Sequence, residues 1–266
     1  MMHIRHHLDT FTIAQISDLH LSAHKPIYTD KFLAVLKLAL EYKPDLLLLT
    51  GDLVNDGDTH LYDWLFDELQ KINIPFVCLA GNHDITHEIG HDLPFHERQF
   101  LPIQADARLV DTHRLIIELP DACWQILSVN SAVHGQIYGH LDDDKLHFLR
   151  SHLANELPTI IAMHHHPLPV GSAWIDGHIL QNHDDFWQAL TPHPNTKAIL
   201  CGHVHQAHEL PIPTPYPATL YTCPATSRQF LPHYGDFKLD DVPEGLRLIH
   251  IYNKEKLATL VKRVQN

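Results

Sequence analysis

The sequence of 266 residues contains no apolar run approaching the roughly 20 residues that cross a lipid bilayer. Its first residues, Met-Met-His-Ile-Arg-His-His, also lack the apolar segment of a signal peptide, so we expect a cytoplasmic protein with no membrane partner. Cysteine is scarce, with four residues and no Cys-x-x-Cys pair. Cys78 and Cys201 lie within apolar segments, where reduced and buried thiols are expected.

Positive charge is scarce as well. Lys and Arg number 19 against 32 Asp and Glu, which gives a formal net charge of −13. A protein that binds the backbone of DNA or RNA needs a basic face, and the sequence has no cluster of Lys and Arg. Long nucleic acid is therefore not an expected partner. A small anion stays a candidate ligand, because bound metal ions can reverse the local field.

Five apolar runs in the sequence end in residue types that bind metal ions. Leu46–Thr50 carries four consecutive leucines, which indicate a strand buried on both faces of a sheet. Gly51 and Asp52 follow it directly and place a carboxylate at the sheet edge, where ligands of α/β proteins bind. The other four segments are Ile13–His20, Phe76–Asp84, Ile160–His166 and Ala198–His205.

The pattern between these runs predicts a mixed α/β fold. Apolar residues at helical spacing predict a helix after Asp30, which is expected to cap it, and a second helix over Leu61–Ile72. These helices lie between the first three strands, which makes those strands parallel with right-handed crossovers. Short segments at Leu115–Leu119 and Trp124–Val129 indicate an antiparallel run. We expect the His- and acid-rich segment Thr86–Phe100 to be helical.

The sequence contains no linker or internal repeat that would divide it, so we expect one domain over residues 1–266. Residues 1–9 are expected to form a flexible N-terminus. Residues 206–266 are expected to cap the domain and to supply closing strands, with Gly245–Tyr252 and Leu257–Val264 as a hairpin. The sequence leaves the oligomeric state open.

The ends of the five runs form one set of candidate metal ligands. Its members are Asp18, His20, Asp52, Asn82, His164, His203 and His205. Nitrogen and oxygen ligands without thiolate suit Mn, Fe, Zn or Co. Seven side chains are too many for one ion, whereas two ions about 3.5–4 Å apart would share them through one bridging carboxylate, for which we favour Asp52. Because alternate residues of a strand share a face, Asp18 and His20 are expected to point the same way, as are His203 and His205.

The residues beside Asn82 suggest acid catalysis. The side chain of His83 is expected to point away from the ligand direction, which leaves it free to act as a proton donor, with Asp84 orienting it. Two divalent ions with two carboxylates and a bridging hydroxide would leave the site positive, which favours a phosphate ester as substrate. We expect the hydroxide to attack phosphorus while His83 protonates the leaving oxygen.

These motifs resemble, in order, those of the calcineurin-like metallophosphoesterases. They are Asp18-x-His20, Gly51-Asp52, Gly81-Asn82-His83-Asp84, His164 and Gly202-His203-x-His205. The resemblance implies a four-layer α-β-β-α sandwich. It also implies that Asp18, His20, Asp52 and His205 hold one ion. Asp52, Asn82, His164 and His203 would hold the other.

Within that family the chain is similar to the bacterial class III cyclic-nucleotide phosphodiesterases. The similarity lies in the segment from His164 to Pro169 followed by Trp174 and Asp176, in Cys201–Gln206 and in Pro224–Phe230. It implies hydrolysis of 3′,5′-cyclic AMP to 5′-AMP with two divalent ions, Fe or Mn, with Zn or Co as alternatives. Expected substrate contacts come from His20, Asp52, Asn82, His83, His164 and His205.

Several alternatives stay open at this point. His165 or His166 would support the metal site from outside if His164 is the ligand, and Arg228 either reaches a phosphate or is an ordinary surface arginine. Trp174, Tyr138 and Phe230 either stack on a base or pack in the fold. The substrate could be another small nucleotide or phosphodiester, and a non-catalytic protein-binding scaffold is the remote alternative.

Overall fold

The leucine-rich strand β3 (Leu46–Thr50) lies inside a five-stranded sheet of a computed structural model that describes residues 1–90, 93–252 and 256–265. Its strand order is β16-β15-β2-β3-β4. The other members are β2 (Thr10–Ile16), β4 (Phe76–Leu79), β15 (Gly245–Tyr252) and β16 (Leu257–Arg263). Strands β2, β3 and β4 are parallel, as predicted, and β15 and β16 form the expected antiparallel hairpin beside β2.

A second sheet has seven strands in the order β1-β7-β8-β9-β10-β12-β11. Its members are β1 (Met2–Arg5), β7 (Thr112–Leu119), β8 (Ala122–Val129), β9 (Thr159–Met163), β10 (Thr196–Cys201), β11 (Glu209–Pro211) and β12 (Thr219–Thr222). Strands β7 and β8 pair antiparallel, whereas β8, β9, β10 and β12 run parallel. The sheet is therefore mixed, as the sequence pattern indicated.

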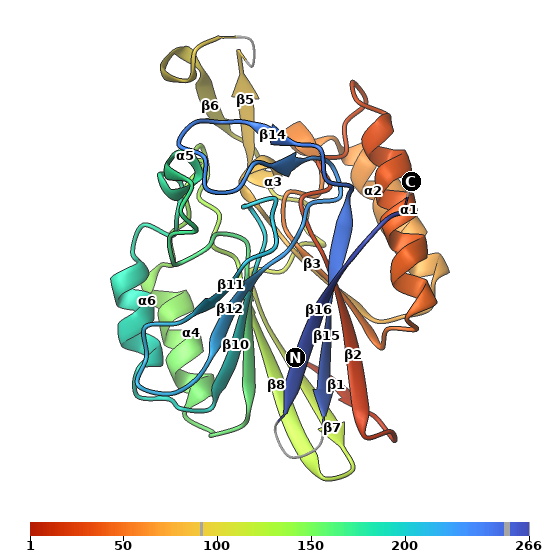
Figure 1. Ribbon diagram of the computed structural model, residues 1–266, viewed down its shortest axis with the longest axis vertical. Helices are drawn as coiled ribbons and strands as arrows, with labels where there is room; N and C mark the ends of the chain where they lie inside the picture. The colour runs from red at the N-terminus through yellow and green to blue at the C-terminus, as the bar shows by residue number, and fades with distance from the viewer. Residues whose placement is uncertain (91–92, 253–255, 266) are drawn as a thin grey trace.

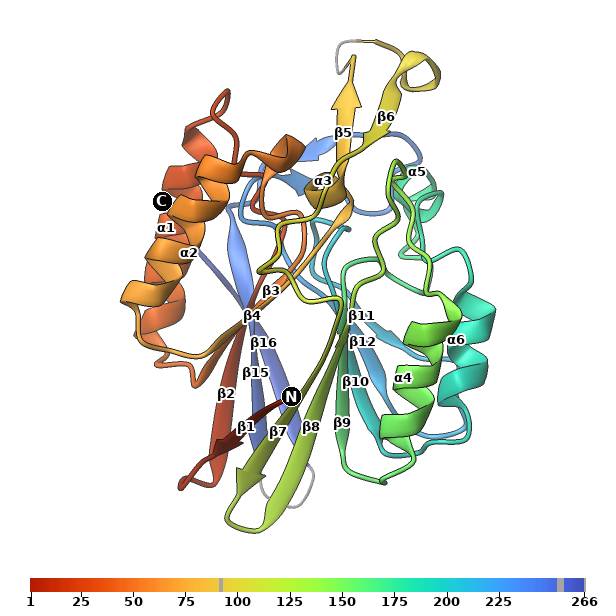
Figure 2. The ribbon, with the colours of Figure 1, turned by 180° about the vertical axis from the view of Figure 1, so that it is seen from behind.

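The two sheets pack face to face with helices outside them, which gives four layers (Figures 1 and 2). Leu46 and Leu48 of β3 lie in a core shared with residues of the other sheet, while Leu47 and Leu49 pack against α1 (Ile27–Glu41) and α2 (Thr59–Lys71). On the far side α4 (Asp143–Leu153) and α6 (His183–Leu190) cover the seven-stranded sheet. The predicted α-β-β-α sandwich is confirmed, and the four leucines are buried on both faces because they alternate between two cores.

Three expectations about local structure need correction. The N-terminus expected to be flexible contains β1, which pairs in parallel with β7. Helix α1 begins at Ile27, so Asp30 lies in its first turn and does not cap it. The segment expected to be helical instead contributes β5 (Thr86–Ile89) and β6 (Gln99–Pro102), which form an antiparallel pair.

The pairing of β5 with β6 has a local cause. Gly90 adopts a positive φ of 87°, a conformation that glycine takes at no steric cost and that stops a helix. Arg98 then pairs with Glu88 at 2.8 Å between the two segments. The hairpin, with a short 3-10 turn η2 (Phe95–Glu97), projects from one end of the molecule (Figure 1). Ile89, Phe95 and Leu101 on it are exposed.

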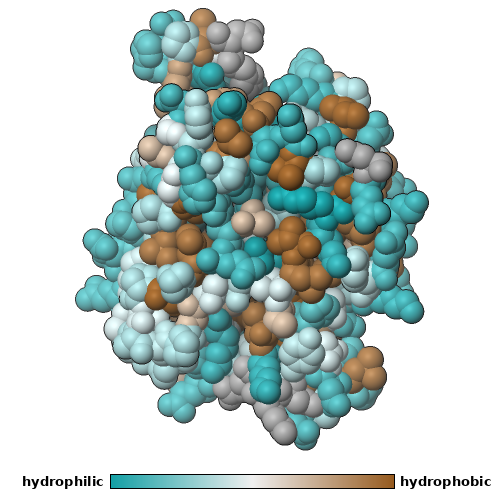
Figure 3. Space-filling model, viewed as in Figure 1, coloured by the Kyte–Doolittle hydropathy of each residue, from teal (hydrophilic) through white to brown (hydrophobic). Residues whose placement is uncertain are grey.

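Short elements surround the carboxyl ends of the central strands. They are η1 (Asn55–Gly57), α3 (Asn82–Ile85), α5 (Ala173–Asp176), β13 (Gln229–Phe230) and β14 (Leu239–Asp240), the last two paired antiparallel. Figure 3 shows that hydrophobic residues on one face of the molecule form patches separated by hydrophilic ones. Within the described part of the chain, none of the helices has the length and apolar character needed to span a membrane.

Candidate metal centre

The edges of the two sheets meet where the candidate ligands lie. Asp18 and Asp52 follow the carboxyl ends of β2 and β3, and His164 and His203 follow those of β9 and β10. Direct hydrogen bonds join the two edges. The backbone N–H of His203 donates to Asp18 Oδ1 at 3.0 Å, and His164 Nδ1 donates to the carbonyl oxygen of Thr50 at 2.7 Å. Residues far apart in the sequence therefore form one site.

The backbone at this site differs from the prediction. Asp18, His20, Asp52, His203 and His205 all have positive φ angles, between 48° and 66°. They lie beyond the ends of their strands, so the alternation of an extended strand does not set their directions. The donor atoms of Asp18 and His20 still lie in one group, as expected, whereas those of His203 and His205 lie in different groups. Non-glycine residues rarely adopt this conformation, which costs roughly 1–3 kcal/mol per residue and concentrates at functional sites.

Asp18, His20, Asp52 and His205 form the first group of candidate ligands. All four are buried, and one donor atom from each lies within 4.8 Å of the others. His20 Nε2 and His205 Nε2 are 3.0 Å apart, His205 Nε2 is 3.4 Å from Asp18 Oδ1, and His20 Nε2 is 3.6 Å from Asp52 Oδ2. These are the four residues that the resemblance implies for one ion.

The protonation of His20 and His205 fits a cation between them. His20 Nδ1 donates to Asn55 Oδ1 at 2.9 Å, and His205 Nδ1 donates to the carbonyl oxygen of Arg228 at 2.8 Å. In a neutral imidazole the other nitrogen then carries a lone pair. Both Nε2 lone pairs therefore face each other, an arrangement that a bound cation would stabilise. An outer hydrogen bond that fixes the tautomer is typical of metal-binding histidines.

A second group surrounds His164 and His203. His164 Nε2 lies 3.4 Å from Asp52 Oδ2 and 3.3 Å from His203 Nδ1. Asp52 thus lies between the two groups, close to His20 on one side and to His164 on the other. Asn82 begins α3, where its Oδ1 atom is buried without a hydrogen-bond partner among the described residues.

His165 also lies near His164 and His203, with donor atoms within 4.8 Å. Its hydrogen bonds separate it from a ligand role. His165 Nδ1 lies 2.9 Å from Ser131 Oγ, and its Nε2 donates to the carbonyl oxygen of Ile137 at 3.2 Å. Both ring nitrogens of His165 have partners outside the set of candidate ligands, whereas His164 Nε2 faces Asp52 and His203, so this geometry favours His164. Ser131, which sequence reasoning missed, also accepts from the His165 backbone.

Unpaired buried atoms provide a test of whether the site fits metal ions. Asp18 Oδ2, Asn82 Oδ1 and His203 Nε2 are buried and have no hydrogen-bond partner within the described ranges. Burying a polar atom without a partner is costly. Three such atoms from three candidate ligands, together with the facing lone pairs of His20 and His205, fit a site built for two cations.

The carboxylates of Asp18 and Asp52 differ in the direction in which their surroundings shift the pKa. Burial raises the pKa of Asp18 to about 7, against the effect of nearby His164. Burial acts in the same direction on Asp52, but His164, His83 and His20 hold its pKa well below the usual range. Asp52 therefore keeps its negative charge in the presence of the surrounding imidazoles, which suits a carboxylate placed between two cations.

The histidines respond to the same environment. Burial, followed by the charge of His83, lowers the pKa of His20 to about 3. Burial also lowers the pKa of His205 well below its usual range, with further contributions from His20 and Arg228. For His164 burial is outweighed by Asp52 and Asp18, which raise its pKa to about 9.

His83 and Asp84 have different surroundings. The His83 backbone N–H donates to Asp52 Oδ1 at 2.9 Å, and its half-buried ring lies 4.7 Å from the ring of His20. The carboxylate of Asp84 accepts from the backbone N–H groups of Leu53, Val54 and Gly81, and from the hydroxyl of Tyr62. No hydrogen bond joins it to His83 in the described part of the structure.

Asp84 therefore joins the loop that follows β3 to the loop that follows β4. These loops carry Asp52 and Asn82, so Asp84 fixes two candidate ligands relative to each other. Sequence reasoning missed Tyr62, because its place on α2 gives no signal of a polar contact. It also expected Asp84 to orient His83, and the observed contacts do not support that role.

Two glycines allow the loops to approach closely. Gly51 has φ 95°, and a Cβ atom there would lie 2.8 Å from the Gly81 backbone nitrogen and would also collide with the His164 ring. At Gly81 a Cβ atom would lie 2.7 Å from His164 Cε1 and would collide with Asp52. These Gly-Asp and Gly-Asn pairs are thus required by packing around His164.

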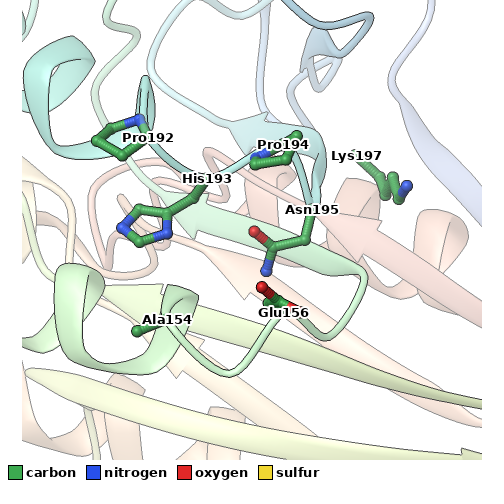
Figure 4. A pocket seen from close by; sticks show the side chains of 7 residues that line it. All are labelled: Ala154, Glu156, Pro192, His193, Pro194, Asn195 and Lys197. Carbon is green, nitrogen blue, oxygen red and sulfur yellow. The ribbon is translucent and has the colours of Figure 1, made fainter.

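A separate hollow of about 580 Å³ lies elsewhere (Figure 4). Its lining includes Glu156 and Asn195, which precede β9 and β10, whereas His164 and His203 follow those strands. The hollow is therefore at the opposite ends of these two strands and contains none of the seven candidate ligands.

Comparison with known proteins agrees with this geometry. Residues 11–207 match the family described as calcineurin-like phosphoesterase. Over 262 residues the chain is 47% identical to a probable cyclic nucleotide phosphodiesterase of Moraxella catarrhalis (strain BBH18), covering 97% of this chain and 94% of that protein. It is 34% identical over 262 residues to the 3′,5′-cyclic adenosine monophosphate phosphodiesterase CpdA of Escherichia coli (strain K12), covering 95% and 89% of the two chains.

A solved structure supports the fold independently. A dimetal phosphatase from Danio rerio superposes with a TM-score of 0.59 at 13% identity, over 96% of this chain and 99% of that chain. The family match spans all the candidate ligands from Asp18 to His205. The chain therefore belongs to the calcineurin-like phosphoesterase family, whose members are hydrolases.

Proposed function

We propose that this protein hydrolyses 3′,5′-cyclic AMP to 5′-AMP with two divalent metal ions. The observation that carries the proposal is the pair of ligand groups that share Asp52 where the two sheet edges meet. The names of the relatives from M. catarrhalis and E. coli support a cyclic nucleotide as the substrate class.

In this proposal each ion has four protein ligands. One ion is held by Asp18, His20, Asp52 and His205. The other is held by Asp52, Asn82, His164 and His203. Imidazole, amide and carboxylate donors without thiolate suit Fe or Mn, with Zn or Co as alternatives. When bound, the two ions polarise the phosphoryl oxygens and lower the pKa of a water molecule, which supplies the nucleophile.

The chain's own residues position the substrate and move the proton. Asp52 is held by the His83 backbone at 2.9 Å, so His83 and the ligand shared by both groups are fixed together. The half-buried His83 ring donates a proton to the oxygen that leaves phosphorus. His20, Asp52, Asn82, His83, His164 and His205 form the surface that contacts the phosphate ester.

The choice of a phosphate ester follows from charge. The protein carries a formal net charge of −13, so an anionic substrate needs a local positive region. The positive charge of two divalent ions would exceed the negative charge of Asp18 and Asp52, the two carboxylates of the ligand set. A cyclic phosphodiester carries one negative charge, and its hydrolysis adds charge to oxygens that such a centre can stabilise.

Metal-loaded protein tests the proposal directly. Protein purified with Mn²⁺ or Fe²⁺ and with its metal content measured should be offered cyclic AMP, an aryl phosphodiester and an aryl phosphomonoester. Hydrolysis of cyclic AMP to 5′-AMP alone, without the 3′ product, is expected. Activity on the monoester only would refute the diesterase proposal. Activity on the aryl diester but on no cyclic nucleotide would indicate another phosphodiester as the substrate. Protein that binds no metal would favour a non-catalytic scaffold.

A further inference from the structure

Four side chains beside the metal centre form a group that the reaction described above does not use. We call Arg228, Trp174, Phe230 and Phe237 the arginine–aromatic cluster. The ring of Phe230 stacks on His205 with centroids 3.9 Å apart and an interplanar angle of 9°. Trp174 and Phe237 meet Phe230 edge to face, at 4.8 Å and 5.4 Å. The cluster is therefore in direct contact with His205, a candidate metal ligand.

The backbone around Arg228 is tied to the metal centre on both sides. The N–H of Ser227 donates to the carbonyl oxygen of Asp18 at 3.2 Å, and Ser227 Oγ donates to the same oxygen at 2.7 Å. The N–H of Phe230 donates to the carbonyl oxygen of His205 at 3.4 Å. The carbonyl oxygen of Arg228 itself accepts from His205 Nδ1. The position of the arginine is thus fixed relative to two candidate ligands.

Among the residues that the structure describes, the guanidinium group of Arg228 has no acidic partner. It lies 6.0 Å from the ring centroid of Phe230 and 5.7 Å from that of Phe237. No carboxylate pairs with it within residues 1–90, 93–252 and 256–265, although the protein has 32 acidic residues. After burial, its charge contributes to the lowered pKa of His20 and of His205. A half-buried cation without an acid is available for an anionic ligand.

Phe237 differs from the rest of the aromatic group. Phe230 is buried against His205, Trp174 and Phe237, so little of its ring is exposed to a ligand. Phe237 is 52% exposed, and it contacts Trp174 edge to face with centroids 5.2 Å apart. Phe237 therefore presents free apolar surface within a side chain's reach of the guanidinium.

We propose that Arg228 binds a phosphoryl oxygen of the substrate and that Phe237 contacts the nucleobase. This inference rests on the proposed function, since it assigns the two parts of a nucleotide to two neighbouring residues. Guanidinium groups form charge-assisted hydrogen bonds with phosphate oxygens. Aromatic rings stack on bases of any sequence, because every base has a π face. A positive charge beside an exposed aromatic ring matches a nucleoside phosphate better than an aliphatic phosphodiester.

Inhibition constants separate the phosphate from the base. Hydrolysis of an aryl phosphodiester by the metal-loaded protein would be inhibited with inorganic phosphate and, separately, with 5′-AMP. The variant Arg228→Met keeps an apolar stem and the backbone bond to His205, and it should raise both inhibition constants about tenfold to a hundredfold. Arg228→Lys should raise the two inhibition constants less than Arg228→Met does. Phe237→Ala should raise only the constant for 5′-AMP, about tenfold.

Matched controls remove the same groups far from the site. Arg150→Met makes the same charge change on an exposed residue in the last turn of α4, and Tyr42→Ala removes an exposed ring beyond the end of α1. Both should leave the inhibition constants unchanged. The inference is overturned if Arg228→Met leaves both constants unchanged or empties a metal site, or if Phe237→Ala raises both constants equally. Wild-type protein that cleaves the aryl diester but not cyclic AMP would instead defeat the proposed function.

Discussion

The hydrogen bond between Tyr62 and Asp84 offers a sharp test of how the metal centre is held. Tyr62 is 1% exposed, and its hydroxyl donates to Asp84, whose carboxylate is fully buried. The same carboxylate accepts from the backbone on both ligand loops. Tyr62→Phe removes only the hydroxyl and leaves the ring in the core that α2 covers, so the change isolates one donor to one buried charge.

The size of the effect follows from the charge of Asp84. Burial, followed by the charge of Asp52, raises the pKa of Asp84 to about 6, so the group is ionised at pH 8. A hydrogen bond to a charged group contributes about 1.5–3 kcal/mol, against about 0.5–1.5 kcal/mol for a neutral pair. We expect Tyr62→Phe to lower the free energy of unfolding by about 1.5–3 kcal/mol at pH 8.

Tyr216 provides the matched control. Its hydroxyl donates at 2.7 Å to the carbonyl oxygen of Leu190, a neutral acceptor. Tyr216→Phe should therefore cost about 0.5–1.5 kcal/mol at any pH. Urea unfolding of both variants and the wild type should be followed in EDTA, because bound metal would add its own stabilisation of the native state.

The pH dependence gives the result that would refute this reasoning. Above pH 6 the Asp84 carboxylate is charged and the Tyr62 hydroxyl is worth most. As the pH falls through 6 the carboxylate gains a proton, so the deficit of Tyr62→Phe should shrink. A deficit no larger than that of Tyr216→Phe, or one that does not change with pH, would show that Asp84 does not hold the loops as a buried anion.

The other predictions concern the metal centre itself. His83→Ala should keep both metals and lower kcat about 10²- to 10⁴-fold on cyclic AMP, with a smaller loss on aryl diesters, whose leaving groups need little protonation; metal analysis that finds an empty site would make His83 a ligand. Asp52→Ala should lose both ions, because the same carboxylate lies beside His20 and His164; normal metal content by mass spectrometry would contradict the bridging role. Metal affinity should rise as the pH increases from 7 to 9, because the pKa of Asp18 is raised to about 7 and that of His164 to about 9, and both ligands must lose a proton. Calorimetry in buffers of different ionisation enthalpy should detect proton release on binding near pH 7, and release that is no smaller in Asp18→Asn would count against Asp18 as a ligand.

Much of the fold was predictable because the apolar pattern is strong. Strand β3 begins and ends where the sequence pattern placed it, at Leu46 and Thr50, since five consecutive buried residues leave little alternative. The closing hairpin was predictable from the alternation of apolar and polar residues in its two segments. The N-terminus and β5–β6 were not, since their strands are short and half exposed, and since β1 is stabilised by pairing with the distant strand β7 and β5 by pairing with β6. Such pairing leaves no periodic signal in the local sequence.

The residue types of the candidate site were predictable, whereas the backbone groups that hold these side chains in place were not. Parallel strands end at one edge of a sheet, so a ligand type at each strand end already implied one site. The carbonyl oxygens of Thr50 and Arg228, by contrast, hold His164 and His205, and any residue type could supply a carbonyl at those positions. The residue types at these positions therefore do not reveal which backbone carbonyl oxygens hold the histidines.

The left-handed backbone explains why the ligands can be both rigid and crowded. A strand that continued past Ile16 or Cys201 would carry successive side chains to opposite faces of its sheet. At Asp18, His20, His203 and His205 the chain instead turns through positive φ directly after the strand. That turn brings His20 Nε2 and His205 Nε2 to 3.0 Å from each other, although they come from different sheets. The buried strands and the Asp84 hydrogen bonds hold these residues in their unfavourable backbone conformation. The free energy that offsets this cost comes from burial of the core that includes the leucines of β3.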